Sequence, residues 1–528
     1  MEDFKDTADK LIKEKKWQEL LDFANKSLAE LNVDSENYNC ELAQIYYAKA
    51  QALNFLESFE QVKVYLEKIF ELEPTKYTAQ AYFVYAWHLA DKGQNLEALP
   101  YANKAVELNP NDLDYYVTRA DIYEKLNQYE HAIDDCNKAI ELDSQNINAY
   151  HVRGRVKAAL SLYAEAIEDF NFVLEKEPNH SRSYGWRASC YNGLENPEQA
   201  LEDYNKAIGL DLDDAASWAN RGETKAILKD IEGAIEDYNK AIELGFNTTD
   251  IYHNRGVAKT ELGKYKEAIP DFNNAIELNP EYAPSYYYRG YAKVALEQYE
   301  EAILDYDKAI ELDPSHEMAY HNRGLVKSHL GKYEGAILDY DKAIELYPNY
   351  AYVYFNRGMA KYLLKQRREA ILDFNKAIEL DSNEPNTYYY RAKTKYELNY
   401  VFNSIIQDLD KAIELGCNNA ELYFIYGNCK YKAEKYKEAL ENYNKAIELE
   451  SNNPEYYFKR AECYAWLNEY KLYSEDMKMV KNLYENYKEP YDLFAYVLIW
   501  KVIKKIFNLV AKVLDRIASL KLFKRRRY

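Results

Sequence analysis

The 528-residue chain has little glycine and little proline, 17 and 13 residues respectively, and few runs of β-branched residues. These shortages argue against a strand-rich fold with many turns. Alanine, leucine, isoleucine, glutamate and lysine dominate instead, and tyrosine is abundant at 55 residues. This composition mostly favours helix.

Cysteine pairs and long apolar runs are also lacking. The six cysteines form no CxxC pair and no histidine stands at zinc-ligand spacing, which argues against a disulfide framework and against a metal knuckle. No stretch of about 18 apolar residues is present to span a bilayer. The charged N-terminus, MEDFKDTADKLIKEKKW, lacks the apolar core of a secretory signal. We therefore expect a cytoplasmic protein.

Positive charge is short as well, because the net charge is −20 at pH 7. Nucleic-acid binding is not expected, since phosphates need a positively charged surface. The charge is unevenly distributed: residues 488–528 carry seven lysines and four arginines against three acidic residues. This segment is therefore +8 and residues 1–487 are −28, so the two parts are interpreted separately.

The chain does contain an internal repeat. The motif KAIEL or a variant recurs with a step of 34 residues from 104 to 376, followed by steps of 35 and 34. A period this regular in helix-forming sequence predicts a helical solenoid. The motif begins at Lys104, Lys138, Phe172, Lys206, Lys240, Asn274, Lys308, Lys342, Lys376, Lys411 and Lys445.

Five positions of the repeat are restricted in residue type. Positions are numbered 1 to 34, with position 1 at Glu317 in the unit 317–350. Position 8 is small, position 20 is nearly always alanine, position 24 is aromatic, position 27 is usually alanine and position 32 is often proline. Small residues let antiparallel helices approach closely, and proline ends the second helix. In these positions the chain resembles the tetratricopeptide repeat family.

The resemblance implies an all-α fold, a right-handed superhelical solenoid of about fourteen antiparallel helix-pair repeats. A C-terminal amphipathic helix, expected from its own residue pattern, follows the repeats. Degenerate repeats cover residues 1–78, regular repeats 79–453 and a terminal repeat 454–487, before the basic segment 488–528. Pro100 and Pro270 lie at position 22, early in the second helix, where a lost hydrogen bond is expected to kink or fray the first turn.

Position 7, usually apolar in the family, is arginine in ten units. The turn between the helices falls near position 15, so position 23 should face position 7, and it is aspartate in all ten. Where position 7 is Tyr426, position 23 changes to Asn442. We interpret the arginines as structural partners of the aspartates, because buried charges must be paired. The expected pairs are Arg119–Asp135, Arg153–Asp169, Arg187–Asp203, Arg221–Asp237, Arg255–Asp271, Arg289–Asp305, Arg323–Asp339, Arg357–Asp373, Arg391–Asp408 and Arg460–Asp476.

In this family, first-helix positions 2, 5, 6, 9, 12 and 13 line the concave, ligand-binding groove of the solenoid. Position 6 is asparagine in four units, at Asn220, Asn254, Asn322 and Asn356. By resemblance, such a ladder hydrogen-bonds the backbone of an extended peptide, since each amide offers donors and an acceptor. Asparagine is also the common residue of the family here, so both interpretations stay open.

The groove positions of residues 283–396 are rich in aromatic residues and methionine, which are favoured at interfaces. We predict a partner-binding surface there, and lateral packing within a tyrosine-rich solenoid is the alternative. The surface comprises Tyr287, Tyr288, Tyr291, His321, Tyr352, Phe355, Met359, Tyr362, Tyr389 and Tyr390.

No pattern of catalytic residues was found. The sequence has no nucleophile–base motif, P-loop or dinucleotide fingerprint. His151, His253 and His321 lie in different repeats without carboxylates at ligand spacing. We therefore predict no enzymatic activity, no metal and no cofactor.

The segment 491–528 places apolar residues at alternating steps of three and four, with its basic residues largely off that stripe. This pattern predicts a basic amphipathic helix with three candidate roles. It caps the last repeat, attaches to anionic lipid, or contacts a partner or the acidic solenoid. Its apolar face includes Trp500, Ile503, Phe507, Val510 and Leu514.

Together these patterns predict a non-catalytic scaffold that binds extended peptides or partner proteins in its groove. The main alternative is a peripheral-membrane adaptor anchored by the C-terminal helix. A regulatory subunit of an enzyme complex is a more remote alternative.

Overall fold

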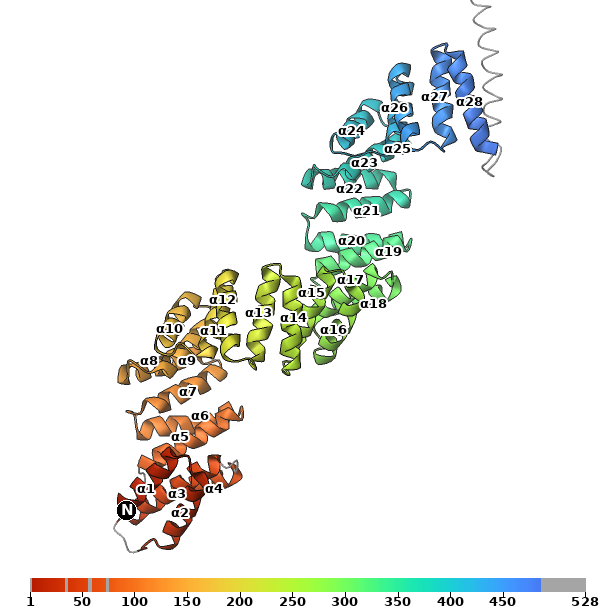
Figure 1. Ribbon diagram of the computed structural model, residues 1–528. Coiled ribbons are helices and arrows are strands. Elements are labelled where there is room, and N and C mark those ends of the chain that lie inside the picture. The colour runs from red at the N-terminus through yellow and green to blue at the C-terminus, as the bar shows by residue number, and fades with distance from the viewer. Residues whose placement is uncertain (1, 34–36, 56–58, 73–75, 486–528) are drawn as a thin grey trace, which may run out of the picture. The chain divides into compact units, whose positions relative to one another are not determined.

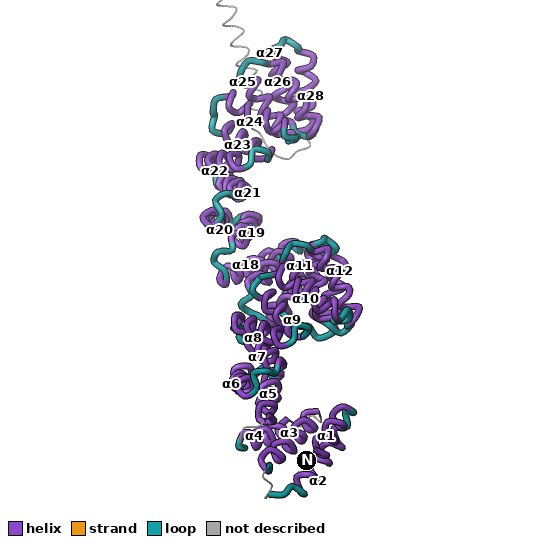
Figure 2. The backbone as a smooth tube through the Cα atoms, turned by 90° about the vertical axis from the view of Figure 1, so that its left-hand side faces the viewer, coloured by secondary structure: helices purple, strands orange, loops and turns teal. Residues whose placement is uncertain are grey.

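The computed structural model describes residues 2–33, 37–55, 59–72 and 76–485, and every regular element in these ranges is an α-helix. The 28 helices follow one another as antiparallel pairs joined by short loops (Figures 1 and 2). The expected all-α solenoid of about fourteen helix-pair repeats is thus confirmed. The C-terminal helix expected at residues 488–528 lies outside the described residues.

The chain divides into two compact units, Met1–Leu296 and Glu297–Tyr528. The first unit contains α1 (Glu2–Lys13), α2 (Trp17–Ala29), α3 (Tyr38–Phe55), α4 (Phe59–Phe70), α5 (Lys76–Asp91), α6 (Asn95–Leu108), α7 (Leu113–Lys125), α8 (Tyr129–Leu142), α9 (Ile147–Ala159), α10 (Tyr163–Lys176), α11 (Ser181–Gly193), α12 (Pro197–Leu210), α13 (Ala215–Ile227), α14 (Ile231–Glu243), α15 (Thr249–Glu261), α16 (Tyr265–Leu278) and α17 (Ala283–Ala295).

The second unit contains α18 (Tyr299–Leu312), α19 (Glu317–His329), α20 (Tyr333–Leu346), α21 (Ala351–Leu363), α22 (Arg367–Leu380), α23 (Pro385–Glu397), α24 (Phe402–Glu414), α25 (Ala420–Lys432), α26 (Tyr436–Leu449), α27 (Pro454–Trp466) and α28 (Tyr470–Glu485). Odd-numbered helices are the first helices of their repeats and even-numbered helices the second. Within each unit, first helices also contact the first helix of the next repeat.

The small residue at position 8 lets the ring at position 24 press against the first helix. A Cβ atom placed on Gly222 would lie 2.8 Å from the Tyr238 ring, and one on Gly358 would lie 2.8 Å from the Phe374 ring. Such distances leave no room for a larger side chain, so glycine at these positions sets how closely the two helices pack. Pro100 lies inside α6 and Pro270 inside α16, and neither proline ends its helix.

The arginine at position 7 joins three helices. Arg221 donates from Nε and Nη2 to the two carboxylate oxygens of Asp237 on α14, at 2.8 and 2.7 Å. Its Nη1 donates to Oδ1 of Asn205 on α12, at 2.8 Å. One guanidinium on α13 therefore links its own second helix to the second helix of the preceding repeat. We call this arrangement the guanidinium junction.

The same bidentate ion pair recurs at the equivalent place in eight further repeats. The structure contains it at Arg119–Asp135, Arg153–Asp169, Arg187–Asp203, Arg221–Asp237, Arg255–Asp271, Arg323–Asp339, Arg357–Asp373, Arg391–Asp408 and Arg460–Asp476. The tenth expected pair, Arg289 and Asp305, has one residue in each unit.

The third partner of the junction, at position 25 of the preceding repeat, was not anticipated from the sequence. It is asparagine or aspartate, and it persists where the arginine does not. The Tyr426 hydroxyl donates to Asp410 at position 25 of the preceding repeat, at 2.5 Å. Asn442, expected to face Tyr426, instead donates to the Glu438 carbonyl oxygen at 2.8 Å.

A lysine at position 11 reinforces six of these ion pairs. Lys225 Nζ lies 2.9 Å from Asp237, and Lys327 Nζ lies 2.7 Å from Asp339. The other four pairs of this kind are Lys157–Asp169, Lys259–Asp271, Lys361–Asp373 and Lys395–Asp408. In the repeat of Arg119, position 11 is Tyr123, so Asp135 depends on the arginine alone.

Buried histidines at position 5 connect consecutive first helices. The Nδ1 atoms of His151 and His253 lie 2.9 and 3.0 Å from the hydroxyl groups of Ser183 and Ser285, at position 3 of the next repeat. Burial lowers the pKa of His151 to about 3 and that of His253 to about 4. His321 is also buried, and its pKa is lowered to about 4 for the same reason.

We expect Arg119→Leu to lower the free energy of local unfolding of α7 and α8 by about 3–5 kcal/mol, because it strands the buried Asp135 carboxylate. Arg323→Leu should cost clearly less around α19 and α20, since Lys327 stays beside Asp339. Amide hydrogen exchange in each helix pair measures both effects. The double variant R119L/D135L should recover much of the loss; if it exchanges as fast as R119L, the pairing is not what stabilises this repeat.

We expect acidification to destabilise the protein through its buried histidines. Below pH 6.5, their value in an unfolded chain, the unfolded state binds more protons than the folded state. For each of these histidines, the free energy of unfolding therefore falls by about 1.4 kcal/mol for every pH unit below 6.5, until the pH reaches the folded-state pKa of that histidine. Thermal unfolding between pH 7.5 and 5.0 should show a steeper fall in Tm for the natural chain than for H151Q/H253Q/H321Q. Parallel curves would contradict this expectation.

Candidate functional site

Two adjoining cavities lie along the first helices α13 and α15. The larger cavity has a volume of about 450 Å³ and the smaller about 290 Å³, and they share Glu223, Tyr238 and Asn254. The larger is lined by Ala219, Asn220, Glu223, Tyr238, Phe246, Thr248, Asp250, Ile251, Asn254 and Tyr282. The smaller is lined by Glu223, Ala226, Ile227, Lys229, Ile231, Tyr238, Asn254, Val257, Ala258 and Glu261.

Local sequence fixes the helices around the larger cavity. Asp214 caps α13 by accepting from the Ser217 amide, and Thr248 caps α15 by accepting from the Ile251 amide. Between α14 and α15, Gly245 has a φ of +90°, which a residue with a side chain rarely adopts. This turn brings Phe246 and Thr248 to the cavity wall.

The guanidinium junction orients the asparagines. Asn220 and Asn254 each directly precede a junction arginine, Arg221 or Arg255, which is bonded to the second helix of its own repeat. These bonds fix the rotation of each first helix about its own axis. Because the asparagine is the neighbouring residue, its position on the helix surface is fixed as well. Both asparagines are half-buried and line the larger cavity.

The larger cavity is acidic. Glu223 and Asp250 are exposed residues that line it, and partial loss of water around Glu223 together with the charge of Asp250 raises the pKa of Glu223. The nearest basic residues on α13, Arg221 and Lys225, are engaged by Asp237 at 2.7 and 2.9 Å. The cavity therefore combines amide groups, carboxylates and aromatic walls, which suits a polar and positively charged ligand.

The other two asparagines expected in the ladder lie in the second unit. Asn356 is buried and its amide donates to Nε2 of His321, at 3.1 Å. The side chain thus holds α21 against α19. Asn322 is half-buried on α19. Of the four asparagines, only Asn220 and Asn254 line the two cavities.

The aromatic residues expected in the groove of the first unit pack partly on their neighbours. The Tyr288 ring lies 5.4 Å from the His253 ring and 6.1 Å from the Phe272 ring. Tyr287 is half-buried beside Tyr288, with ring centroids 5.2 Å apart. Tyr291 is 44% exposed.

In the second unit, the expected aromatic residues divide into exposed and buried ones. Tyr352 is 48% exposed and its ring lies 5.7 Å from the buried His321 ring. Phe355 and Met359 are half-buried against a cluster that contains Tyr362. Lateral packing, the alternative left open by the sequence, accounts for much of this surface.

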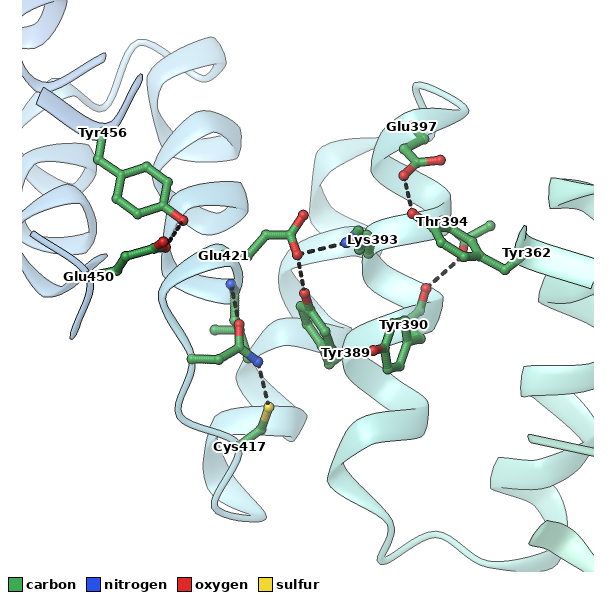
Figure 3. A network of polar contacts seen from close by, with 12 residues as sticks. Tyr362, Tyr389, Tyr390, Lys393, Thr394, Glu397, Cys417, Glu421, Glu450 and Tyr456 are labelled. Carbon is green, nitrogen blue, oxygen red and sulfur yellow. Dashed lines mark hydrogen bonds and ion pairs between the residues drawn. The ribbon is translucent and has the colours of Figure 1, made fainter. Parts of the chain in front are cut away.

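Tyr362 and Tyr389 are buried by neighbouring repeats and enter a polar network (Figure 3). The Tyr362 hydroxyl donates to Glu397, and the Tyr389 hydroxyl donates to Glu421 at 2.6 Å. Burial is the largest cause of the raised pKa of both phenols, and the neighbouring carboxylates add to it. Tyr390 is half-buried next to Tyr389.

The acidic residues of the larger cavity were not predicted from the sequence. Glu223 occupies position 9 and Asp250 position 2, both of which are groove positions of the family. Their negative charge at groove positions of consecutive repeats is the signal that indicates them, whereas amide and aromatic residues at groove positions do not. The cavity-lining Tyr282 and Phe246 precede first helices and lie outside the groove positions altogether.

Neither a metal-binding cluster nor a membrane-spanning helix is present in the described part of the chain. No group of three or more histidine, cysteine, aspartate or glutamate side chains there is placed to hold a metal ion. Within the same ranges, no helix combines the length and the apolar character needed to cross a bilayer.

Several solved structures resemble parts of this chain. YrrB, described as a tetratricopeptide repeat protein with an unusual peptide-binding site, is 24% identical, with 38% of this chain and 99% of YrrB covered and a TM-score of 0.33. MamA of Desulfovibrio magneticus RS-1 is 23% identical, with 32% and 96% covered and a TM-score of 0.29. The APC/C hetero-tetramer Cut9-Hcn1 gives 14% identity, 86% and 95% coverage and a TM-score of 0.35.

Models of the tetratricopeptide repeat match along most of the chain. They cover residues 43–76, 79–112, 114–146, 151–211, 193–245, 249–282, 290–328, 318–350, 351–384 and 427–465. The six single-repeat matches, at 43–76, 79–112, 114–146, 249–282, 318–350 and 351–384, each fall on one observed helix pair. The chain belongs to the tetratricopeptide repeat family, whose members are typically non-catalytic scaffolds that bind protein or peptide partners.

Proposed function

We propose that this protein is a non-catalytic scaffold whose groove along α13 and α15 binds an extended peptide segment of a partner protein. The observation that carries the proposal is the pair of adjoining cavities, about 450 and 290 Å³, which share Asn254. The smaller cavity continues along the same two helices toward their C-terminal ends. A ligand that fills both is therefore elongated.

Asn220 and Asn254 supply the hydrogen bonds to the peptide backbone in this proposal. A carboxamide both donates and accepts, which matches the N–H and C=O groups of an extended chain whatever its side chains are. The two amides lie on first helices of consecutive repeats. Packed helices are roughly 10 Å apart, a distance that about three residues of extended peptide span.

The charges of the site support a peptide over a nucleic acid. Glu223, Asp250 and Glu261 line the two cavities, with Lys229 as the basic residue. Phosphate groups would be repelled by this surface.

We expect Asn254→Ala to weaken binding of peptides selected from a random library against the full chain by about ten- to thirtyfold. The amide contributes up to two hydrogen bonds of about 1 kcal/mol each. Fluorescence anisotropy with labelled peptides measures the affinities. Asn274→Ala on α16, an exposed asparagine of a second helix, is the matched control. Equal affinities of the two variants would overturn the proposed site.

Attachment to anionic membranes through residues 488–528 is a second candidate function, supported by the sequence of that segment alone. Its seven lysines and four arginines accompany a regular apolar stripe with one tryptophan. Each basic residue near an anionic surface contributes about 1 kcal/mol.

We expect the full chain to float with phosphatidylserine-containing liposomes at low salt and to be released by salt. The variant K501E/K504E/K505E should bind at least about a hundredfold more weakly, because three attractive charges are lost. Flotation across a salt series measures this, with circular dichroism as the control for folding. If the natural chain stays at the bottom of the gradient at low salt, this candidate function is wrong.

A further inference from the structure

We infer that the larger cavity binds the side chain of a lysine or arginine in the partner peptide, an inference that rests on the proposed function. Glu223, at position 9 of one repeat, and Asp250, at position 2 of the next, line the cavity together. Among the described residues, neither carboxylate has a lysine or arginine nitrogen within the 4.0 Å of an ion pair. Two carboxylates in one cavity repel each other, and a cation between them relieves that repulsion.

The same two repeat positions form an ion pair within the second unit. Lys393 is at position 9 of its repeat, and Glu421 is at position 2 of the next. Lys393 Nζ lies 2.7 Å from the Glu421 carboxylate, and the lysine side chain is only 20% exposed (Figure 3). Positions 9 and 2 of consecutive repeats are therefore close enough for an ammonium group to contact a carboxylate. In the first unit, the place of that ammonium group is taken by a second carboxylate, Glu223.

Position 5 determines whether this space is filled. In α23 it is Tyr389, which is 5% exposed and donates its hydroxyl hydrogen to Glu421 at 2.6 Å. In α13 it is Ala219, which has no ring to place there and instead lines the cavity. At Glu421, Lys393 and Tyr389 donate hydrogen bonds to the carboxylate. At the equivalent Asp250, Glu223 and Ala219 take their places and donate none, and the space is left for a ligand.

Other side chains suit the cavity less well. An acidic side chain would meet two carboxylates, and an apolar one would remove water from them without compensation. A long basic side chain satisfies the carboxylates with its charged end. Its alkyl stem can pack against the rings of Tyr238 and Tyr282, which also favour a cation over their faces.

The test uses the full chain and an oriented peptide library, in which the residues selected at each position are counted. We expect selection of lysine or arginine at one position, and at least about tenfold weaker binding when that residue is replaced by norleucine or citrulline. Glu223→Lys copies the residue of position 9 in α23, so its ammonium group should pair with Asp250 and abolish the selection. Glu236→Lys on the exposed face of α14 changes the net charge equally and should keep it.

The outcomes separate the two proposals. Selected peptides without a basic residue, or unchanged selection by E223K, would overturn the inference while leaving the peptide groove intact. A library from which no peptide is enriched would overturn the proposed function and the inference with it. If both E223K and E236K lose the selection of basic residues, the overall acidic charge of the protein causes that selection and the cavity does not. This result would also overturn the inference.

Discussion

The arginine at position 7 bonds to its own second helix and to the second helix of the repeat before it, and the arrangement of the solenoid depends on this contact. The Arg221 and Asp237 side chains are 13% and 3% exposed, so both charges have lost most of their water. Such desolvation offsets much of the electrostatic attraction. The contact is strongly directional, however, because a guanidinium and a carboxylate meet through two parallel hydrogen bonds. It therefore specifies the register and rotation of three helices.

An aromatic residue at position 4 completes this environment. The Arg221 guanidinium lies 4.6 Å from the centroid of the Trp218 ring, and Arg357 lies 5.4 Å from the Tyr354 ring. The rings lie over the cations, so a cation–π attraction adds to each ion pair. Part of the tyrosine abundance is explained by this position and by the buried ring at position 24, such as Tyr340.

Because position 7 holds the backbone, the neighbouring groove positions are free to differ between repeats. Position 5 shows the range: Ala219 leaves a cavity, His253 bonds to the next first helix, and Tyr389 fills the space with a ring. The same backbone thus carries an open site in one place and closed packing in others. Whether a repeat has an open cavity is therefore determined by its own groove residues, such as the residue at position 5.

Much of this architecture could be predicted from the sequence, because a 34-residue period and small residues in phase leave few alternatives to stacked helix pairs. The arginine–aspartate pairing could be predicted too, since position 23 is aspartate wherever position 7 is arginine and becomes Asn442 where position 7 is Tyr426. The partner at position 25 could not be predicted, because it lies in the preceding repeat and because asparagine is also a common residue on exposed helix surfaces. The cavity could not be predicted either, because its volume depends on the space beside Asp250 that the small side chain of Ala219 leaves unfilled.

The guanidinium junction also has a consequence for how the gene can change. The partners of a junction arginine lie 16 residues before it and 16 residues after it, or 17 after it at Arg391, at the same positions in successive units. Deleting or duplicating one whole unit between residues 113 and 453 brings an equivalent asparagine or aspartate up to every junction arginine, so no charge is left without a partner. The array can therefore grow or shrink by recombination between units and reorder its groove residues while the joints between repeats stay the same.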